Sequence, residues 1–217
     1  MARHLTVLLT ATIIFLSCTE NSPEINQVFW QINKFNDTGN NSYHERLVLF
    51  LDVSDEDGTE DLKTLYVIND DAELYWKISS DEWIHRPEKG ENWIGTNTIT
   101  MNDYSPIPAG SYRVVVVDDA GEREETEIFV AATETAVLPE HFPSAVVRQN
   151  SLSYSENTVY IWFYSSDMKL ISEAATAGNE WKSVIAPEKT KTAYLYRFDR
   201  AGGFGLVSGP YEINREY

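Results

Sequence analysis

The stretch YRVVVVDDAG, residues 112–121, decides the fold class of this 217-residue chain. Tyr112, Val114 and Val116 fall on one face of an extended segment, which is typical of a β-strand that buries one face. The DDAG that follows predicts a tight turn, because Asp side chains accept hydrogen bonds from nearby backbone and glycine adopts a positive φ at little cost. Another candidate strand, 125–130, comes next. The stretch therefore predicts a β-hairpin.

The same alternation recurs along the chain, and no segment has the period of a long helix. The candidate strands are rich in β-branched and aromatic residues and are separated by Gly, Asn, Asp and Pro. They are 46–53, 63–68, 73–79, 111–118, 125–130, 158–164, 192–198 and 204–213. We therefore expect an all-β protein.

Three short motifs occur twice, in the same order. They are WKISSD at 76–81 and WFYSSD at 162–167, GENW at 90–93 and GNEW at 178–181, and DDAG at 118–121 and DRAG at 199–202. An ordered set of this kind indicates an internal duplication. We therefore expect two homologous domains, 24–132 and 133–217.

The hairpin stretch, with the IPAG that precedes it at 107–110, resembles the last hairpin of bacterial immunoglobulin-like and fibronectin-type modules. Tyr112 stands at a place like the tyrosine corner of that family. The resemblance implies two tandem immunoglobulin-like β-sandwich domains of about seven short strands each. Neither repeat has the antibody-type Cys…Trp…Cys pattern, so the resemblance is to the sandwich architecture.

The N-terminus has the composition of a secretory signal. A short basic start precedes an apolar run over 5–16, which is too short to cross a bilayer as a permanent helix. The only cysteine, Cys18, follows directly after Ser17. This resembles a bacterial lipoprotein signal, in which the cysteine is lipidated and becomes the new N-terminus. An ordinary signal peptide with an incidental Cys18, or an uncleaved anchor helix, are the alternatives.

The resemblance implies a signal peptide over 1–17, a lipidated N-terminus and tether over 18–23, and a place in the bacterial cell envelope on the periplasmic or the surface face. The chain has 34 acidic and 17 basic residues, for a net charge of −17. Such a surface repels nucleic acid and anionic lipid headgroups. We therefore expect no nucleic-acid partner, and contact with the membrane only through the lipid anchor.

One segment concentrates carboxylates around Gly58. The residues are Asp52, Asp55, Asp57, Glu60 and Asp61. Calcium takes six to eight oxygen ligands, and a loop of this composition supplies several of them. A calcium site is one interpretation, and a solvated acidic connection between two strands is the other. No other cofactor is expected.

The tryptophans have two interpretations, core packing and ligand contact. Trp76 and Trp162 recur in the repeat, so we expect both in the cores, and we expect Trp93 and Trp181 to be packed as well. Trp83 lies in a polar stretch and is the candidate for an exposed aromatic contact with a ligand, against packing at the rim of a core.

The sequence holds none of the common catalytic motifs: there is no Gly-x-Ser-x-Gly, no His-Glu-x-x-His and no phosphate-binding glycine loop. We therefore expect a non-enzymatic, membrane-anchored envelope lipoprotein that mediates protein–protein interaction or supports envelope structure. Its partner would be an unknown protein of the cell envelope or of a host. A carbohydrate-binding module of the cell surface is the alternative, and an enzyme or an accessory subunit is the third.

Overall fold

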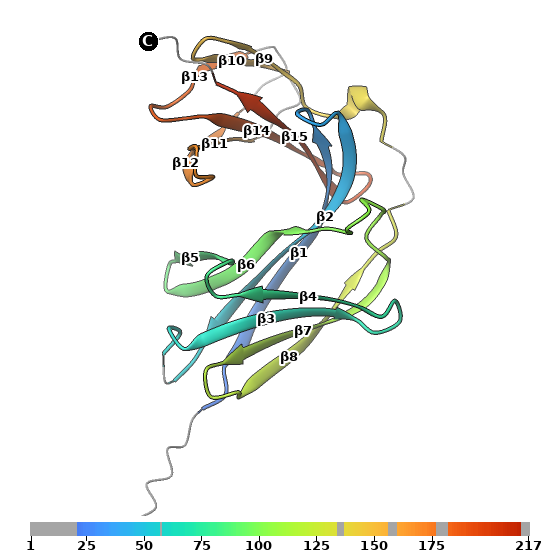
Figure 1. Cartoon of the computed structure of the whole chain (residues 1–217), viewed down its shortest axis with the longest axis vertical. Helices are drawn as coiled ribbons and strands as arrows, with labels where there is room; N and C mark the ends of the chain where they lie inside the picture. Colours follow the sequence, from blue (N-terminus) through green and yellow to red (C-terminus); the bar gives the residue numbers. More distant parts are fainter. Residues whose placement is uncertain (1–20, 57, 134–136, 156–159, 177–181, 214–217) are drawn as a thin grey trace, which may run out of the picture.

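The computed structural model describes residues 21–56, 58–133, 137–155, 160–176 and 182–213. Over these ranges the chain is all-β, with three sheets and one 3₁₀ helix, η1 (Pro139–His141) (Figure 1). The predicted fold class is confirmed. Within the same ranges, no helix has the length and apolar character needed to span a bilayer. The predicted signal peptide and Cys18 lie outside the described residues.

The strands follow one another along the chain with short connections. They are β1 (Glu24–Asp37), β2 (Ser42–Ser54), β3 (Leu62–Asn69), β4 (Leu74–Ser79), β5 (Ile84–Glu88), β6 (Glu91–Ile99), β7 (Gly110–Asp118), β8 (Arg123–Val130), β9 (Ala145–Arg148), β10 (Ser151–Tyr154), β11 (Tyr160–Tyr164), β12 (Leu170–Ala175), β13 (Lys182–Ile185), β14 (Thr192–Asp199) and β15 (Phe204–Glu212). The eight-stranded sheet has the order β12-β11-β14-β15-β1-β2-β6-β5, the four-stranded sheet β4-β3-β7-β8, and the three-stranded sheet β13-β10-β9.

All eight candidate strands are confirmed, as β2, β3, β4, β7, β8, β11, β14 and β15. The sequence missed the other seven strands. The longest of these, β1, escapes the period-two pattern because of a bulge between Ile25 and Gln27 and because apolar residues occupy both of its faces. Ile32 faces a core, whereas Phe29 and Phe35 lie on the opposite face.

The hairpin at 112–121 forms as predicted, between β7 and β8. The Asp118 carboxylate accepts hydrogen bonds from the backbone N–H groups of Gly121 and Glu122, at 2.7 and 2.8 Å, and Gly121 has a φ of 92°. Tyr112 is fully buried, and its hydroxyl donates to the carbonyl oxygen of Pro108, four residues upstream, at 2.7 Å. This is the contact that a tyrosine corner makes.

The counterpart turn in the second repeat shares the hydrogen bond from the backbone N–H of the motif glycine to the first Asp, and differs in its second donor. The Asp199 carboxylate accepts from the backbone N–H groups of Ala201 and Gly202, at 3.0 and 2.9 Å, and the turn joins β14 to β15. The third motif of the repeat therefore has one structural role in both places. The second motif is not comparable, because 177–181 lie outside the described residues.

The two largest hydrophobic cores lie one on each side of the predicted domain boundary. The first packs the four-stranded sheet against β1, β2 and β6, and all of its residues fall within 25–130. The second packs the three-stranded sheet against β11 and β14, within 145–213. Each core therefore lies between two packed sheets, and Figure 1 shows these two pairs of sheets as the lower and upper halves of the molecule.

The eight-stranded sheet nevertheless runs through both halves. β1 pairs with β15 in parallel, with Asn33–Asp37 opposite Gly205–Gly209, and with β2 in the antiparallel sense. The hydrophobic cores separate near residue 132, whereas the backbone hydrogen bonds of the eight-stranded sheet connect the two halves. The division into domains 24–132 and 133–217 stays a prediction.

Candidate functional site

A groove with a volume of about 430 Å³ lies on one face of the eight-stranded sheet. It is lined from β1, β2, β5 and β6 of the first half and from β11, β12, β14 and β15 of the second. Figure 1 shows the sheet bending between the halves, with the edge strands β12 and β5 on the same open side. The groove is therefore built by the shared sheet rather than by either sandwich alone.

Strand alternation decides which side chains reach the groove. In β11, Ile161 and Phe163 point into the second core, so Trp162 between them points the other way, into the groove. The other aromatic residues that line the groove come from β1, β2, β11 and β14 in the same manner. They are Phe29, Phe35, Phe50, Tyr164, Tyr194 and Tyr196.

The expectation that Trp162 belongs to a core is therefore wrong. Trp76, its counterpart in the repeat, packs against the first core, and its indole N–H donates to the Thr100 carbonyl at 3.1 Å. The two differ because Trp76 shares the core face of β4 with Ile78, whereas the core face of β11 is occupied by the neighbours of Trp162, Ile161 and Phe163. The indole N–H of Trp162 donates to Glu173 at 2.8 Å. Trp93 is half-buried, and Trp181 lies outside the described residues.

Five of the aromatic rings that line the groove contact one another in two sets. The ring centroids of Trp162 and Tyr196 are 5.3 Å apart, and those of Tyr164 and Tyr194 are 5.6 Å apart. Phe35 extends the row across the sheet, 5.8 Å from Tyr194. Burial raises the pKa of each of these tyrosine hydroxyls, so all three are neutral hydrogen-bonding groups at pH 7.

A polar network lies beside these rings. The Gln31 amide N–H₂ donates to the Tyr196 hydroxyl at 3.0 Å and to the side-chain oxygen of Asn33, which is buried. Gly205, on β15, faces Asn33 across the parallel pair. A Cβ at that position would collide with the side chains of Asn33, Gln31 and Tyr196. Glycine is required there by the close approach of the network.

Two arginines line the groove from the first half. The Arg46 guanidinium lies 3.9 Å from the ring centroid of Phe35, and its Nε–H donates to the Nε2 atom of His44 at 3.0 Å. The Arg86 guanidinium lies 6.0 Å from the centroid of Phe50. Among the described residues, neither arginine has a carboxylate within ion-pair distance.

His44 positions Arg46 by accepting the hydrogen bond from its Nε–H. Its ring stacks on Phe35, with centroids 5.2 Å apart, and contacts Tyr104 at 4.8 Å. Burial lowers the pKa of His44, and the neighbouring charge of Arg46 lowers it further, while Asp37 opposes the shift. His44 is therefore neutral at pH 7, with the unprotonated Nε2 accepting from Arg46.

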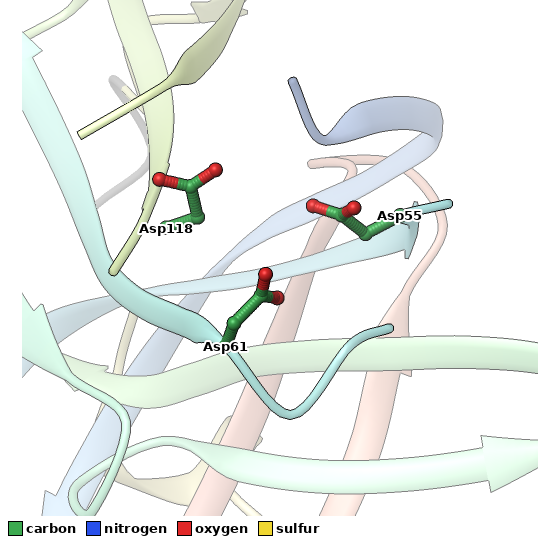
Figure 2. Close-up of side chains that lie close together, drawn as sticks. All are labelled: Asp55, Asp61 and Asp118. Carbon is green, nitrogen blue, oxygen red and sulfur yellow. The ribbon is translucent and has the colours of Figure 1, made fainter. Parts of the chain in front are cut away.

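The acidic segment forms a different cluster from the one expected. Asp55, Asp61 and Asp118 each place a carboxylate oxygen within 4.8 Å of the others. Figure 2 shows the three side chains arriving from separate segments and surrounding a common space. Asp118 enters because the backbone N–H of Asp119 donates to the Asp61 carbonyl at 2.9 Å, which joins the acidic segment to the β7–β8 turn.

Two of the predicted calcium ligands, Asp52 and Glu60, are described by the structure and are not in this cluster. Asp52 is buried elsewhere and accepts a hydrogen bond from the backbone N–H of Asn92 at 2.8 Å, and Glu60 is exposed. Asp57 lies outside the described residues. Only the pairing of β3 with β7, which sets Leu62 opposite Asp118, would have indicated the third member.

Trp83 does not line the groove. It is half-buried and packs against the first core, which is the rim-packed alternative to an exposed ligand contact. Its neighbours Ile84 and Arg86, on β5, are the residues that reach the groove. The sequence therefore singled out a residue that adjoins the groove lining, and not the residues of that segment that line it.

No protein-family model matches the chain, and no curated protein sequence is similar to it. Several solved structures resemble it distantly, and three of them, all of bacterial proteins, match over most of its length. Dimeric latent PorU from Porphyromonas gingivalis is 11% identical with a TM-score of 0.37, over 87% of this chain and 20% of that one. Tp47, the 47-kilodalton lipoprotein of Treponema pallidum, is 10% identical with a TM-score of 0.34, over 87% and 50%.

The third structure is the SGBP-B of the Bacteroides ovatus mixed-linkage glucan utilization locus, in complex with a mixed-linkage heptasaccharide. It is 10% identical with a TM-score of 0.25, over 88% of this chain and 64% of that one. The chain thus spans between 20% and 64% of the length of these three proteins. The similarities are too distant to assign this chain a family, a ligand or a partner.

Proposed function

We propose that this chain is a non-enzymatic binding protein of the bacterial cell envelope, and that its groove takes an oligosaccharide. The observation that carries the proposal is the lining of the groove: a row of half-buried aromatic rings lies next to amide and hydroxyl groups held in fixed positions. Sugar rings have apolar C–H faces and hydroxyl edges, so they need both kinds of surface together. Tyrosine and tryptophan supply such surface with few rotatable bonds.

The dimensions of the groove favour a small ligand over a protein partner. A volume of about 430 Å³ lies within the range of about 300–1,000 Å³ that is typical of small-molecule sites. A stable protein interface instead buries about 1,200–2,000 Å² and is usually flatter. We therefore favour carbohydrate binding, which was the alternative hypothesis from the sequence, over protein–protein interaction, which was the first.

The composition of the groove also supports binding without catalysis. Glycoside hydrolases use a pair of carboxylates that flank the scissile bond. Among the described residues that line the groove there is one carboxylate, Glu173, and it already accepts a hydrogen bond from Trp162.

In this proposal a lipid on Cys18 holds the protein to a membrane. Two or three acyl chains, at about 0.8 kcal/mol per buried CH₂, are enough for stable anchoring. The strongly acidic body is repelled by anionic headgroups, which keeps the groove in the aqueous phase. Labelling with a radioactive fatty acid tests this step, because a Cys18→Ala chain is expected to lose the label. Unchanged labelling would contradict the anchor.

A calcium ion at Asp55, Asp61 and Asp118 is a second candidate, favoured by the approach of the three carboxylates to within 4.8 Å. Such an ion would sit at the end of the first sandwich, where it would join the acidic segment to the β7–β8 turn. In this arrangement it supports the fold rather than the groove.

Binding of the full-length chain to an oligosaccharide panel, followed by calorimetry on the hits, tests the proposed function. Trp162→Ala and Tyr194→Ala are expected to weaken binding about tenfold or more each, since each removes a ring from the row. Tyr75→Ala is the matched control, because Tyr75 is 70% exposed on β4, outside the groove. A hit that responds equally to all three variants, or the absence of any hit, would contradict the proposal.

A further inference from the structure

We infer that the groove selects an acidic oligosaccharide, one with carboxylate groups on its sugar rings, and that Arg46 and Arg86 bind those carboxylates. This inference rests on the proposed function and names the class of glycan. The geometry that carries it is the presence of two arginines without carboxylate partners on the wall of a groove that belongs to a very acidic protein.

Two arginines outside the groove have carboxylate partners: Arg113 pairs with Asp70 at 2.6 Å and with Glu125 at 3.2 Å, and Arg197 lies 3.7 Å from Asp199. Arg123, Arg148 and Arg200 form no ion pair among the described residues, but they are exposed and lie outside the groove. Arg46 differs from them because it is half-buried, so water compensates its unpaired charge less well. The groove therefore holds one half-buried and one exposed guanidinium that a carboxylate from outside the chain can pair with.

Arg46 is held in place for such a ligand. Its guanidinium is stacked over Phe35, and its Nε–H is fixed by His44, which leaves the two Nη groups for a ligand. A guanidinium that is partly buried without a counter-ion is costly, so it gains the most when a carboxylate arrives. Planar guanidinium and planar carboxylate match each other through two parallel N–H···O bonds.

Each arginine has a tyrosine of the opposite half nearby. The charge of Arg46 acts on the Tyr194 hydroxyl, and the charge of Arg86 acts on the Tyr164 hydroxyl, in each case opposing the rise that burial imposes on the pKa of the tyrosine. A bound carboxylate would therefore meet a cation from the first half and a hydroxyl donor from the second. The neighbouring rings of Trp162 and Tyr196 are left for the apolar faces of the sugars.

The one carboxylate among the described groove residues does not neutralise this arrangement. Glu173 lies on β12, is exposed, and accepts from the Trp162 indole. It forms no ion pair with Arg46 or Arg86. Its negative charge on the β12 side and the positive charges on the β2 and β5 side give the groove a polarity across its width, which orients a chain whose acidic groups lie along one edge.

The test compares an oligouronate with its carboxyl-reduced counterpart, which has the same rings and linkages but no charge. We expect the full-length chain to bind the oligouronate at least about tenfold more tightly, as charge-assisted hydrogen bonds predict. The advantage should shrink between about 0.05 M and about 0.5 M NaCl, because salt screens the exposed charge of Arg86. Arg46→Gln and Arg86→Gln should each remove most of the advantage, so that the ratio of the two affinities falls toward one.

Lys77→Gln is the matched control, because it removes one positive charge from an exposed position on β4, outside the groove. Arg86 is exposed, so its variant keeps the test decisive if Arg46→Gln unfolds. Equal affinity for the charged and the reduced sugar, with loss in Trp162→Ala, overturns this inference and leaves the proposed function standing. Binding of neither sugar, or binding of poly-glutamate in place of both, overturns the two together.

Discussion

The Nε–H of Arg46 donates to the unprotonated Nε2 of His44 at 3.0 Å, so one residue of the groove wall depends on the protonation state of a buried neighbour. Protonation of His44 would place two cations against each other and remove the acceptor. The chain has lowered the pKa of this histidine, chiefly by burial, and so keeps it neutral near pH 7.

The first prediction concerns stability against pH. The pKa of His44 is lowered in the folded state, so the unfolded chain takes up a proton first as the pH falls below the ordinary value of 6.5. The His44 contribution is fully present above 6.5 and is lost progressively between 6.5 and the folded-state pKa. Urea unfolding at a series of pH values should show a falling free energy, and His44→Phe, which keeps a ring between Phe35 and Tyr104, should flatten the slope.

His85→Asn is the control for that experiment, because His85 is an exposed histidine on β5. It should leave the slope of the parent chain unchanged. A slope that persists in His44→Phe would show that other groups are responsible.

A second prediction concerns Gly205. Alanine at this position would push against Asn33, Gln31 and Tyr196. We therefore expect a loss of about 1–3 kcal/mol in the free energy of unfolding and weaker glycan binding in the groove. Chemical unfolding and glycan calorimetry measure the two effects. Gly39→Ala is the comparison, since a Cβ there comes no closer than 3.3 Å to another atom. Equal behaviour of the two variants would argue against a tightly packed network.

A third prediction concerns the tyrosine corner. Tyr112→Phe keeps the buried ring and removes the hydroxyl that donates to the Pro108 carbonyl. We expect a loss of about 1–2 kcal/mol in the free energy of unfolding, because a partly buried hydrogen bond is lost. Tyr75→Phe, at an exposed position, should cost nothing measurable. A neutral Tyr112→Phe would mean that the contact does not stabilise the fold.

A fourth prediction concerns the link between the halves. A protease site placed after Thr133 should yield two fragments that stay together on size exclusion under native conditions, because β1 and β15 remain paired across the cut. Phe35→Pro disrupts β1 within the stretch that pairs with β15 and should let the nicked fragments separate. Separation without that substitution would support two independent domains.

A fifth prediction concerns calcium. If the ion binds at Asp55, Asp61 and Asp118, then calcium at about 100 times its Kd should raise the melting temperature by about 5 °C. Asp61→Asn should abolish the rise, and Asp71→Asn, an exposed acidic residue outside the cluster, should preserve it. No shift in the parent chain would leave the cluster as a solvated acidic connection.

Sequence reasoning located strands whose apolar residues alternate, without deciding which face is the core. β7 was found in this way, and the turn at 118–121 was found because Asp and Gly are chemically suited to it. β14 was also found, although its tyrosines line the groove and Ala193 and Leu195 face the core. β11 was found too, but its sequence YIWFY is apolar on both faces. Period-two alternation cannot choose between two apolar faces, and this is why Trp162 was assigned to a core.

The groove itself was beyond the reach of the sequence. It depends on the parallel pairing of β1 with β15, two strands separated by most of the chain, and no local pattern encodes that partnership. The acidic segment could be read as a concentration of charge, but Asp118 joins it only through the pairing of β3 with β7. Local chemistry was therefore predictable, whereas long-range juxtaposition was not.

The placement of β1 has a mechanical consequence. Its backbone is bonded along one side to β2 and, near its end, to β15 on the other, and it follows directly after the segment that would lead to the lipid. A pull on that segment acts along the strand axis, so it loads the flanking hydrogen bonds in shear, many at once, instead of peeling them singly. A protein tethered at this end would be pulled, when its bound polymer is dragged, along the direction in which its strand pairing is mechanically strongest.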